Sequence, residues 1–215
     1  MTNPKYAHIL MIIDRSGSMA DIKSAAEEGV NGFVKTQQEL ATQGMRITLS
    51  LAQFDDKFDW VDQMRVIADP NLTEQPAFFY HLKPRNATAL RDAIGKAVTE
   101  DGDRLAAMSE NDRPGKVVVV IQTDGKENAS REWTYESIEK LIDQQKNQYA
   151  WEFVFLSSDL SSAKFSRDIG IRNTMEFDNT AAGASSAYQT SGLAVRSYLS
   201  GANESVDLQL ESTSE

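Results

Sequence analysis

The stretch ILMIIDRSGSM, residues 9–19, joins an aliphatic run to a short polar segment with one acid and two hydroxyls. An unbroken apolar run indicates a strand that is covered on both faces, as in a parallel sheet. Asp14, Ser16 and Ser18 therefore follow the end of a buried strand. In open α/β sheets, ligands bind beyond the carboxyl ends of the strands, so these three side chains are candidates for a functional site.

Further apolar runs of the same kind predict strands over residues 47–54, 117–121 and 151–156, in addition to residues 8–13. Residues 57–66 follow the second strand so closely that we expect them to return antiparallel as an edge strand. A short sixth strand is predicted near residues 174–177.

Helical spacing of apolar residues separates these strands, over residues 22–40, 90–97, 135–142 and about 184–199. Strands that alternate with helices predict an α/β fold: a doubly wound, mostly parallel six-stranded sheet with one antiparallel edge strand and helices on both faces. We expect residues 1–201 to form one domain.

Composition narrows the function classes. Lysine and arginine number 22 and aspartate and glutamate 32, a net charge of −10, which argues against binding to nucleic acid or to an anionic membrane. There is no cysteine, and we find neither a signal peptide nor a membrane span, so we expect a cytoplasmic protein. Residues 202–215 carry four acids and no base and predict a disordered acidic tail.

Two other segments also carry side chains with oxygen atoms next to the ends of predicted strands or helices. Thr88 stands just before the helix at residue 90, and Asp124 follows the strand at 117–121. Each has an ordinary structural explanation: Ser18 and Thr88 suit helix caps, and Asp124-Gly125 is a turn signal. Taken together, Asp14, Ser16, Ser18, Thr88 and Asp124 supply only oxygen, which suits Mg²⁺, Mn²⁺ or Ca²⁺ better than zinc or copper.

The segments DRSGSM (14–19), TALRDAI (88–94) and TDGKEN (123–128) resemble the von Willebrand factor type A (VWA) domain with its metal-ion-dependent adhesion site, in its small prokaryotic or phage form. The resemblance implies that Ser16, Ser18 and Thr88 are hydroxyl ligands of a divalent cation, and that Asp14 and Asp124 bind it directly or through water. Relatives often have a glycine pair before the threonine, where this chain has Asn86 and Ala87.

The function that this resemblance implies is a non-catalytic, metal-dependent binding module that captures a carboxylate of a partner protein. Two alternatives stay open: a metal-assisted hydrolase or phosphotransferase that uses the same cation, and a scaffold component with an empty site. The two histidines, His8 and His81, are better explained by packing or surface exposure than by catalysis. Asp55, Asp56 and Asp59 form an acidic group that we interpret as a solvated turn rather than a second cation site.

Overall fold

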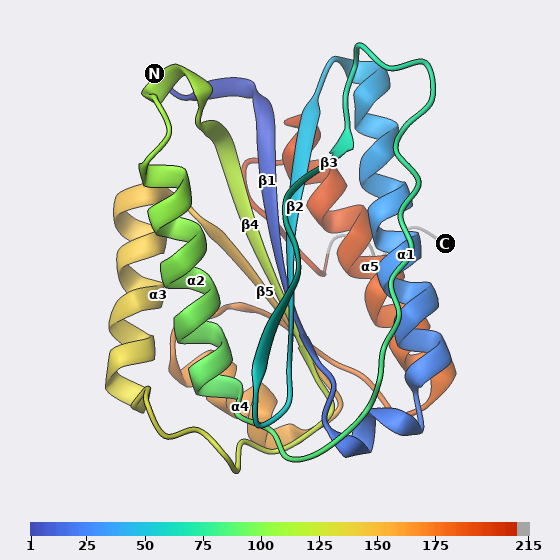
Figure 1. The fold of residues 1–215 in the computed structure, drawn as a ribbon, viewed down its shortest axis with the longest axis vertical. Coiled ribbons are helices and arrows are strands. Elements are labelled where there is room, and N and C mark those ends of the chain that lie inside the picture. The colour runs from blue at the N-terminus through green and yellow to red at the C-terminus, as the bar shows by residue number, and fades with distance from the viewer. Residues whose placement is uncertain (210–215) are drawn as a thin grey trace.

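A six-stranded sheet runs through the middle of the computed structural model, which describes residues 1–209 (Figure 1). The strand order is β3-β2-β1-β4-β5-β6, and only β3 is antiparallel to its neighbour. The strands are β1 (Asn3–Asp14), β2 (Arg46–Phe54), β3 (Phe58–Ala68), β4 (Pro114–Thr123), β5 (Glu152–Ser157) and β6 (Asn173–Glu176). The predicted fold class, including its antiparallel edge strand, is confirmed.

Helices cover both faces of the sheet. In Figure 1, α1 (Lys23–Gln38) and α5 (Ala181–Ser200) lie on one side, and α2 (Leu90–Ala106) and α3 (Tyr135–Tyr149) on the other. The described residues also form α4 (Leu160–Asp168) and three short 3₁₀ segments, η1 (Gly17–Ala20), η2 (Glu39–Gln43) and η3 (Glu110–Asp112). Between the layers, the side chains from Ile9 to Ile13 are fully buried, as their unbroken apolar pattern predicts.

The α4 helix was not predicted. Its sequence, LSSAKFSRD, has too few apolar residues to show a helical period. The signal that it does carry is a cap: the carboxylate of Asp159 accepts a hydrogen bond from the amide of Ser162 at 2.9 Å.

The α1 and α5 helices approach each other closely at a glycine. A Cβ atom placed on Gly29 of α1 would lie 2.2 Å from the ring of Tyr188 on α5. Glycine is required here because the buried tyrosine ring occupies the space that any other side chain needs.

The prediction of a disordered acidic tail from residue 202 is wrong for residues 202–209. Val206 and Leu208 are buried in the core layer shared with α1 and α5. The prediction counted charges over the whole segment. It therefore overlooked two apolar side chains that alternate with polar ones and pack into the core. Glu211 and Glu215 lie outside the described residues. Within residues 1–209, no helix is long and apolar enough to cross a membrane.

Candidate metal centre

The loops that follow β1 and β4 bring the predicted residues together at one end of the sheet. Strands β1 and β4 are direct neighbours, and Ile13 pairs with Gln122, so Asp14 and the segment Thr123–Asp124 leave the sheet side by side. Thr88 reaches the same place from the loop before α2. The topology therefore places all three predicted segments at the carboxyl edge, where doubly wound sheets bind ligands.

The three hydroxyls converge on a single point above Gly125. A Cβ atom on this glycine would lie 3.1 Å from Thr88 Oγ1, 3.4 Å from Ser18 Oγ and 3.5 Å from Ser16 Oγ. Ser16 Oγ and Ser18 Oγ are 3.2 Å apart. Glycine at position 125 thus leaves open a small space that is lined by oxygen.

Asp14 stands behind this space as its buried support. One carboxylate oxygen accepts a hydrogen bond from the Ser16 amide and the other accepts one from the Thr123 hydroxyl, both at 2.6 Å. Burial raises the pKa of Asp14 to about 6, although these hydrogen bonds lower it, and the nearby charge of Asp124 raises it further. Asp14 therefore holds the backbone at Ser16 in place and adds negative charge beneath the hydroxyls.

Asp124 has a free oxygen at the site. Its Oδ1 accepts a hydrogen bond from Ser18 Oγ at 2.8 Å, while Oδ2 is buried and has no hydrogen-bond partner. Burial raises the pKa of this carboxyl, and the charges of Asp21 and Asp159 add to the effect. A buried carboxylate oxygen without a partner is costly, so a bound cation would satisfy it.

The helix-cap explanations of Ser18 and Thr88 do not hold. The cap position of α2 is Ala89, and that of α1 is Ile22, and neither helix start has a side-chain cap. The amide of Thr88 instead donates to Asn128 Oδ1 at 2.9 Å, and its carbonyl accepts from the Asn128 amide at 3.0 Å. With its backbone held from both sides, Thr88 directs its hydroxyl toward Gly125.

The loop before Thr88 adopts its shape without the glycine pair of relatives. Asn86 takes the left-handed conformation with φ of 60°, which asparagine tolerates better than most residues. Its carbonyl accepts a hydrogen bond from the Gly17 amide at 3.1 Å, and its side-chain amide donates to Asp56 at 2.9 Å. The Thr88 loop is therefore tied to the DRSGSM segment at Gly17.

Asp55 organises this loop, a role that the sequence analysis missed. Its side chain is fully buried rather than part of a solvated turn, and Oδ2 accepts from Arg85 Nε at 2.5 Å and Arg15 Nε at 3.0 Å. The Asp55 carbonyl accepts from the Ala89 amide at 2.8 Å. Burial raises the pKa of Asp55, but these bonds and the amide of Lys57 outweigh it and hold the pKa below its ordinary value.

The loop after β4 is held by two further acids that the sequence analysis did not single out. Glu127 accepts from the amide of Arg91 at 2.9 Å and from Ser130, and Asp92 accepts from the amide of Trp133 at 2.8 Å. A sequence offers little sign of the pairs with Arg91 and Trp133, because these residues are 36 and 41 positions away from their acids. These bonds fasten the loop that carries Asp124 to the start of α2.

The chemistry of the donor set fits a hard divalent cation. Within residues 1–209 there is no cluster of three or more His, Cys, Asp or Glu side chains of the kind that binds a metal unaided. The arrangement instead combines three hydroxyls and one free carboxylate oxygen, with Asp14 behind them. Oxygen donors with few charges suit Mg²⁺, which usually keeps several waters.

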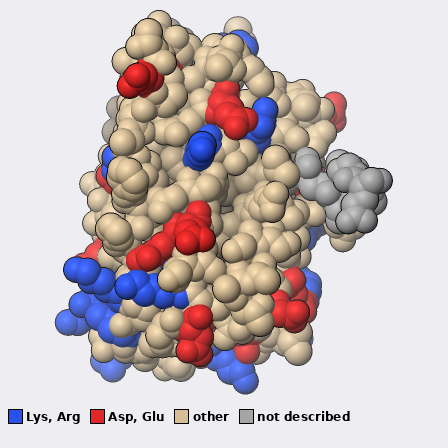
Figure 2. Space-filling model, turned by 90° about the vertical axis from the view of Figure 1, so that its right-hand side faces the viewer, with Lys and Arg blue, Asp and Glu red and all other residues tan. Residues whose placement is uncertain are grey.

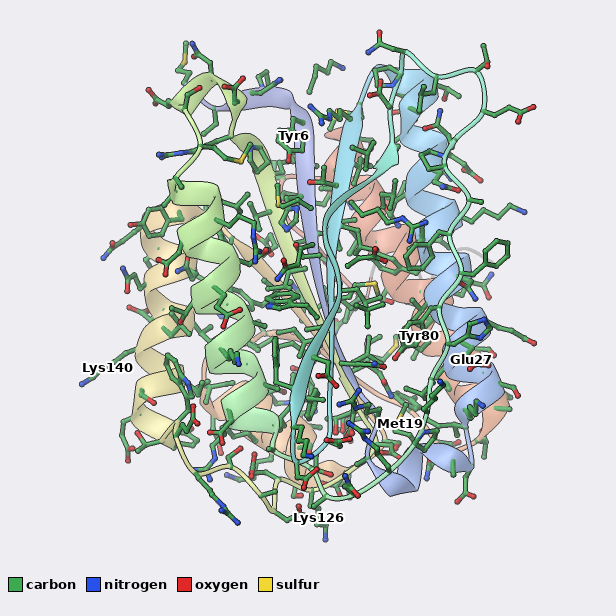
Figure 3. All side chains as sticks on the ribbon, viewed as in Figure 1. Tyr6, Met19, Glu27, Tyr80, Lys126 and Lys140 are labelled. Atoms are coloured by element: carbon green, nitrogen blue, oxygen red, sulfur yellow. The ribbon has the colours of Figure 1, made fainter. Side chains whose placement is uncertain are left out.

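The candidate metal centre lies at the lower end of the molecule in Figure 1, and basic side chains gather at the same end in Figure 2. Met19, next to Ser18 in the chain, is fully buried and accepts a hydrogen bond from Gln122 of β4 at 3.4 Å. Figure 3 shows Met19 close to this end, with Lys126 at the outer edge. Of the five site residues, Ser18 is exposed, while Asp14, Ser16, Thr88 and Asp124 are buried.

Solved structures with this architecture include VWA domains. The chain superimposes on the VWA protein of Catenulispora acidiphila with a TM-score of 0.56, 14% identity, and coverage of 88% of this chain and 42% of that one. The chain has a VWA-like fold. The PilB minor pilin of Streptococcus sanguinis superimposes on this VWA-like chain with a TM-score of 0.59 and 12% identity. The match covers 90% of this chain and 62% of the pilin.

A third solved structure with the VWA-like fold is described as holding a metal. Proximal thread matrix protein 1 from the mussel byssus, with a zinc-occupied metal-ion-dependent adhesion site, matches with a TM-score of 0.57 and 14% identity over 85% of this chain and 46% of that one. The chain spans between two fifths and two thirds of the length of these three proteins. No model of a protein family and no curated protein matches the sequence.

Proposed function

We propose that this chain is a metal-dependent binding module that captures a carboxylate of a partner protein through a divalent cation. The observation that carries the proposal is the convergence of Ser16, Ser18 and Thr88 on the space above Gly125, beside the unpartnered oxygen of Asp124. These four side chains would hold the ion, and Asp14 would support them from behind. Mg²⁺ is the cation that we expect, with Mn²⁺ and Ca²⁺ as substitutes.

The donor set explains why such an ion would seek an outside ligand. Hydroxyls are neutral, so the protein offers the ion little negative charge beyond Asp124 and the more distant Asp14. A bound cation would supply an electron-poor centre, and a partner carboxylate would balance its remaining charge. The VWA-like architecture and the pilin and adhesion-site proteins that share it support a binding role.

The enzymatic alternative has no histidine at the site. His8 is fully buried between Thr48 and Asp101, away from the hydroxyls, and His81 is exposed on the long loop beside α1. A hydrolase needs a general acid or base within reach of its substrate, and neither histidine is placed for this task. The two carboxyl groups at the site are engaged otherwise: Asp14 accepts from the Ser16 amide and Thr123, and Asp124 accepts from Ser18. We therefore expect no turnover in a metal-dependent phosphatase or nuclease screen.

Titration calorimetry with Mg²⁺, Mn²⁺ and Ca²⁺ tests the proposal directly. We expect the wild-type chain to bind a divalent cation and Asp124→Asn to lose that binding, because the substitution removes the free carboxylate charge. Asp103→Asn, an exposed residue of α2, removes the same charge elsewhere and serves as the control. If the wild type binds none of the three ions, the scaffold alternative replaces the proposal.

A further inference from the structure

Two exposed lysines beside the candidate metal centre have no partner within the part of the chain that the structure describes. Most basic side chains of this acidic chain form an ion pair, a hydrogen bond or a contact with an aromatic ring. Lys57 and Lys83 are both exposed, and within residues 1–209 neither ammonium group has such an interaction. Unpaired positive charge on a chain with a net charge of −10 is available to an outside ligand.

Both lysines belong to loops that are tied to the site through Asp55. Lys57 lies in the turn between β2 and β3, and its amide donates to Asp55 Oδ1 at 2.7 Å. Lys83 precedes Arg85, which donates to the same carboxylate, in the loop that leads to Thr88. Both lysines therefore belong to segments on the side of the site that faces the edge strand β3.

The opposite side of the site carries the other sign of charge. Asp21 and Asp159 are close enough to Asp124 to raise its pKa, and they flank the loops after β1 and β5. Lys126, next to Gly125, is near Asp159 and helps to lower the pKa of that carboxyl. Around the three hydroxyls, the side toward β3 carries four basic groups (Arg15, Lys57, Lys83 and Arg85) against three acids (Asp55, Asp56 and Asp59). The side toward α4 carries Asp21 and Asp159 against Lys126. The basic groups are thus in excess toward β3 and the acids toward α4.

We propose, on the basis of the function proposed above, that the partner presents its metal-binding carboxylate within an acidic segment. Further Asp or Glu side chains on one side of that carboxylate contact Lys57 and Lys83. Complementary charge accelerates association and sets the direction in which the segment lies. A nucleic acid does not fit, because a uniform polyanion would also meet Asp21 and Asp159 on the other side.

Selection from a random peptide library on the Mn²⁺-loaded chain tests this inference. The variant is Lys57→Gln/Lys83→Gln. The matched control is Lys35→Gln/Lys140→Gln, which removes the same charge from two exposed lysines on α1 and α3. Lys35 is in the last turn of α1, and Figure 3 shows Lys140 on α3, away from the site. Each selected peptide is then measured against all three proteins with and without EDTA, at low and at physiological salt.

We expect the selected peptides to share one acid and to carry additional acids on one side of it. Their affinity should fall roughly fivefold in Lys57→Gln/Lys83→Gln, the effect of losing two exposed ion pairs, and stay within about twofold in the control. In peptides selected on the variant, the additional acids should disappear while the shared acid remains.

Three results would overturn the inference, and they differ in what they say of the proposed function. Peptides with a single acid and no flanking acids would overturn the acidic segment but leave metal-dependent capture standing. Peptides without a shared acid, or ones that bind equally in EDTA, would remove the proposed function as well. An oligonucleotide that displaces the peptides would assign the lysines to polyanion binding instead.

Discussion

At the scale of single residues, Gly125 decides whether the candidate metal centre is open. The five predicted residues are brought together, but the space between their oxygens exists because position 125 has no side chain. Its neighbour Asp124 contributes a buried oxygen that has no hydrogen-bond partner. Two acids, three hydroxyls and the absence of a side chain at position 125 thus define the site.

Gly125→Ala should close this space. The added methyl would lie 3.1 Å from Thr88 Oγ1 and 3.4 Å from Ser18 Oγ, so it competes with a cation for the same position while the fold persists. We expect the Mn²⁺ affinity measured by calorimetry to fall at least about tenfold, a loss of about 1.4 kcal/mol. Gly102→Ala, where the new methyl meets only ordinary contacts at 3.7 Å, is the control. Unchanged affinity in Gly125→Ala would show that the ion does not bind above this glycine.

Most site residues were predictable at this scale because each follows its own strand or precedes its own helix in the sequence. Asp14, Ser16, Ser18 and Asp124 are at strand ends that the apolar runs already marked. The roles of Asn128 and Thr123 were not predictable, since a hydrogen bond to Thr88 or Asp14 depends on which loops meet in space.

At the scale of elements, the loop before α2 is shaped by its neighbours more than by its own residues. The buried carboxylate of Asp55, at the end of β2, joins Arg15 after β1 to Arg85 in this loop. Asn86 supplies the left-handed turn, and Asn128 holds the backbone of Thr88 from the other side. A cluster that the sequence suggested was a solvated turn is therefore the junction of three segments.

Asp55→Asn should affect stability and metal binding together. The substitution leaves the buried Arg15 guanidinium and its neighbour Arg85 with only the half-exposed Asp59 as a charge partner, a loss on the order of 3 kcal/mol in unfolding free energy. We also expect weaker Mn²⁺ binding, because Thr88 loses its anchored loop. Urea denaturation and calorimetry measure the two effects. Asp62→Asn, whose ion pair with Arg65 is partly exposed, should change both by much less.

At the scale of the whole molecule, a buried polar network joins the layers on the α2 side of the sheet. Asp101 of α2 lies 2.6 Å from His8 Nε2 on β1, accepts from Ser50 on β2 at 2.8 Å, and pairs with Arg104. Burial raises the pKa of Asp101, but its neighbours, with His8 foremost, outweigh that effect and hold the pKa below its ordinary value. The carboxylate is therefore stabilised in its charged form.

This network predicts how stability depends on pH. A carboxyl group whose pKa is lowered on folding contributes stability that is complete above its unfolded pKa of about 4 and is lost as pH falls through the lower folded value. We expect Asp101→Asn to reduce the unfolding free energy at pH 7 by on the order of 3 kcal/mol. The difference from wild type should shrink below about pH 4. Urea titrations from pH 7 to pH 3 measure it, and a difference that does not shrink would contradict the prediction.

The sequence by itself determined the doubly wound sheet, its antiparallel edge strand and the five candidate ligands, because apolar periodicity and strand-end chemistry are local properties. Only the tertiary structure decided what surrounds them. Val206 and Leu208 pack into the core despite their acidic surroundings, and Asp55 is buried among arginines that are distant in sequence. The cytoplasmic location stays a prediction. Contacts between residues that are distant in the sequence depend on which segments the fold brings together. No local sequence pattern predicts them.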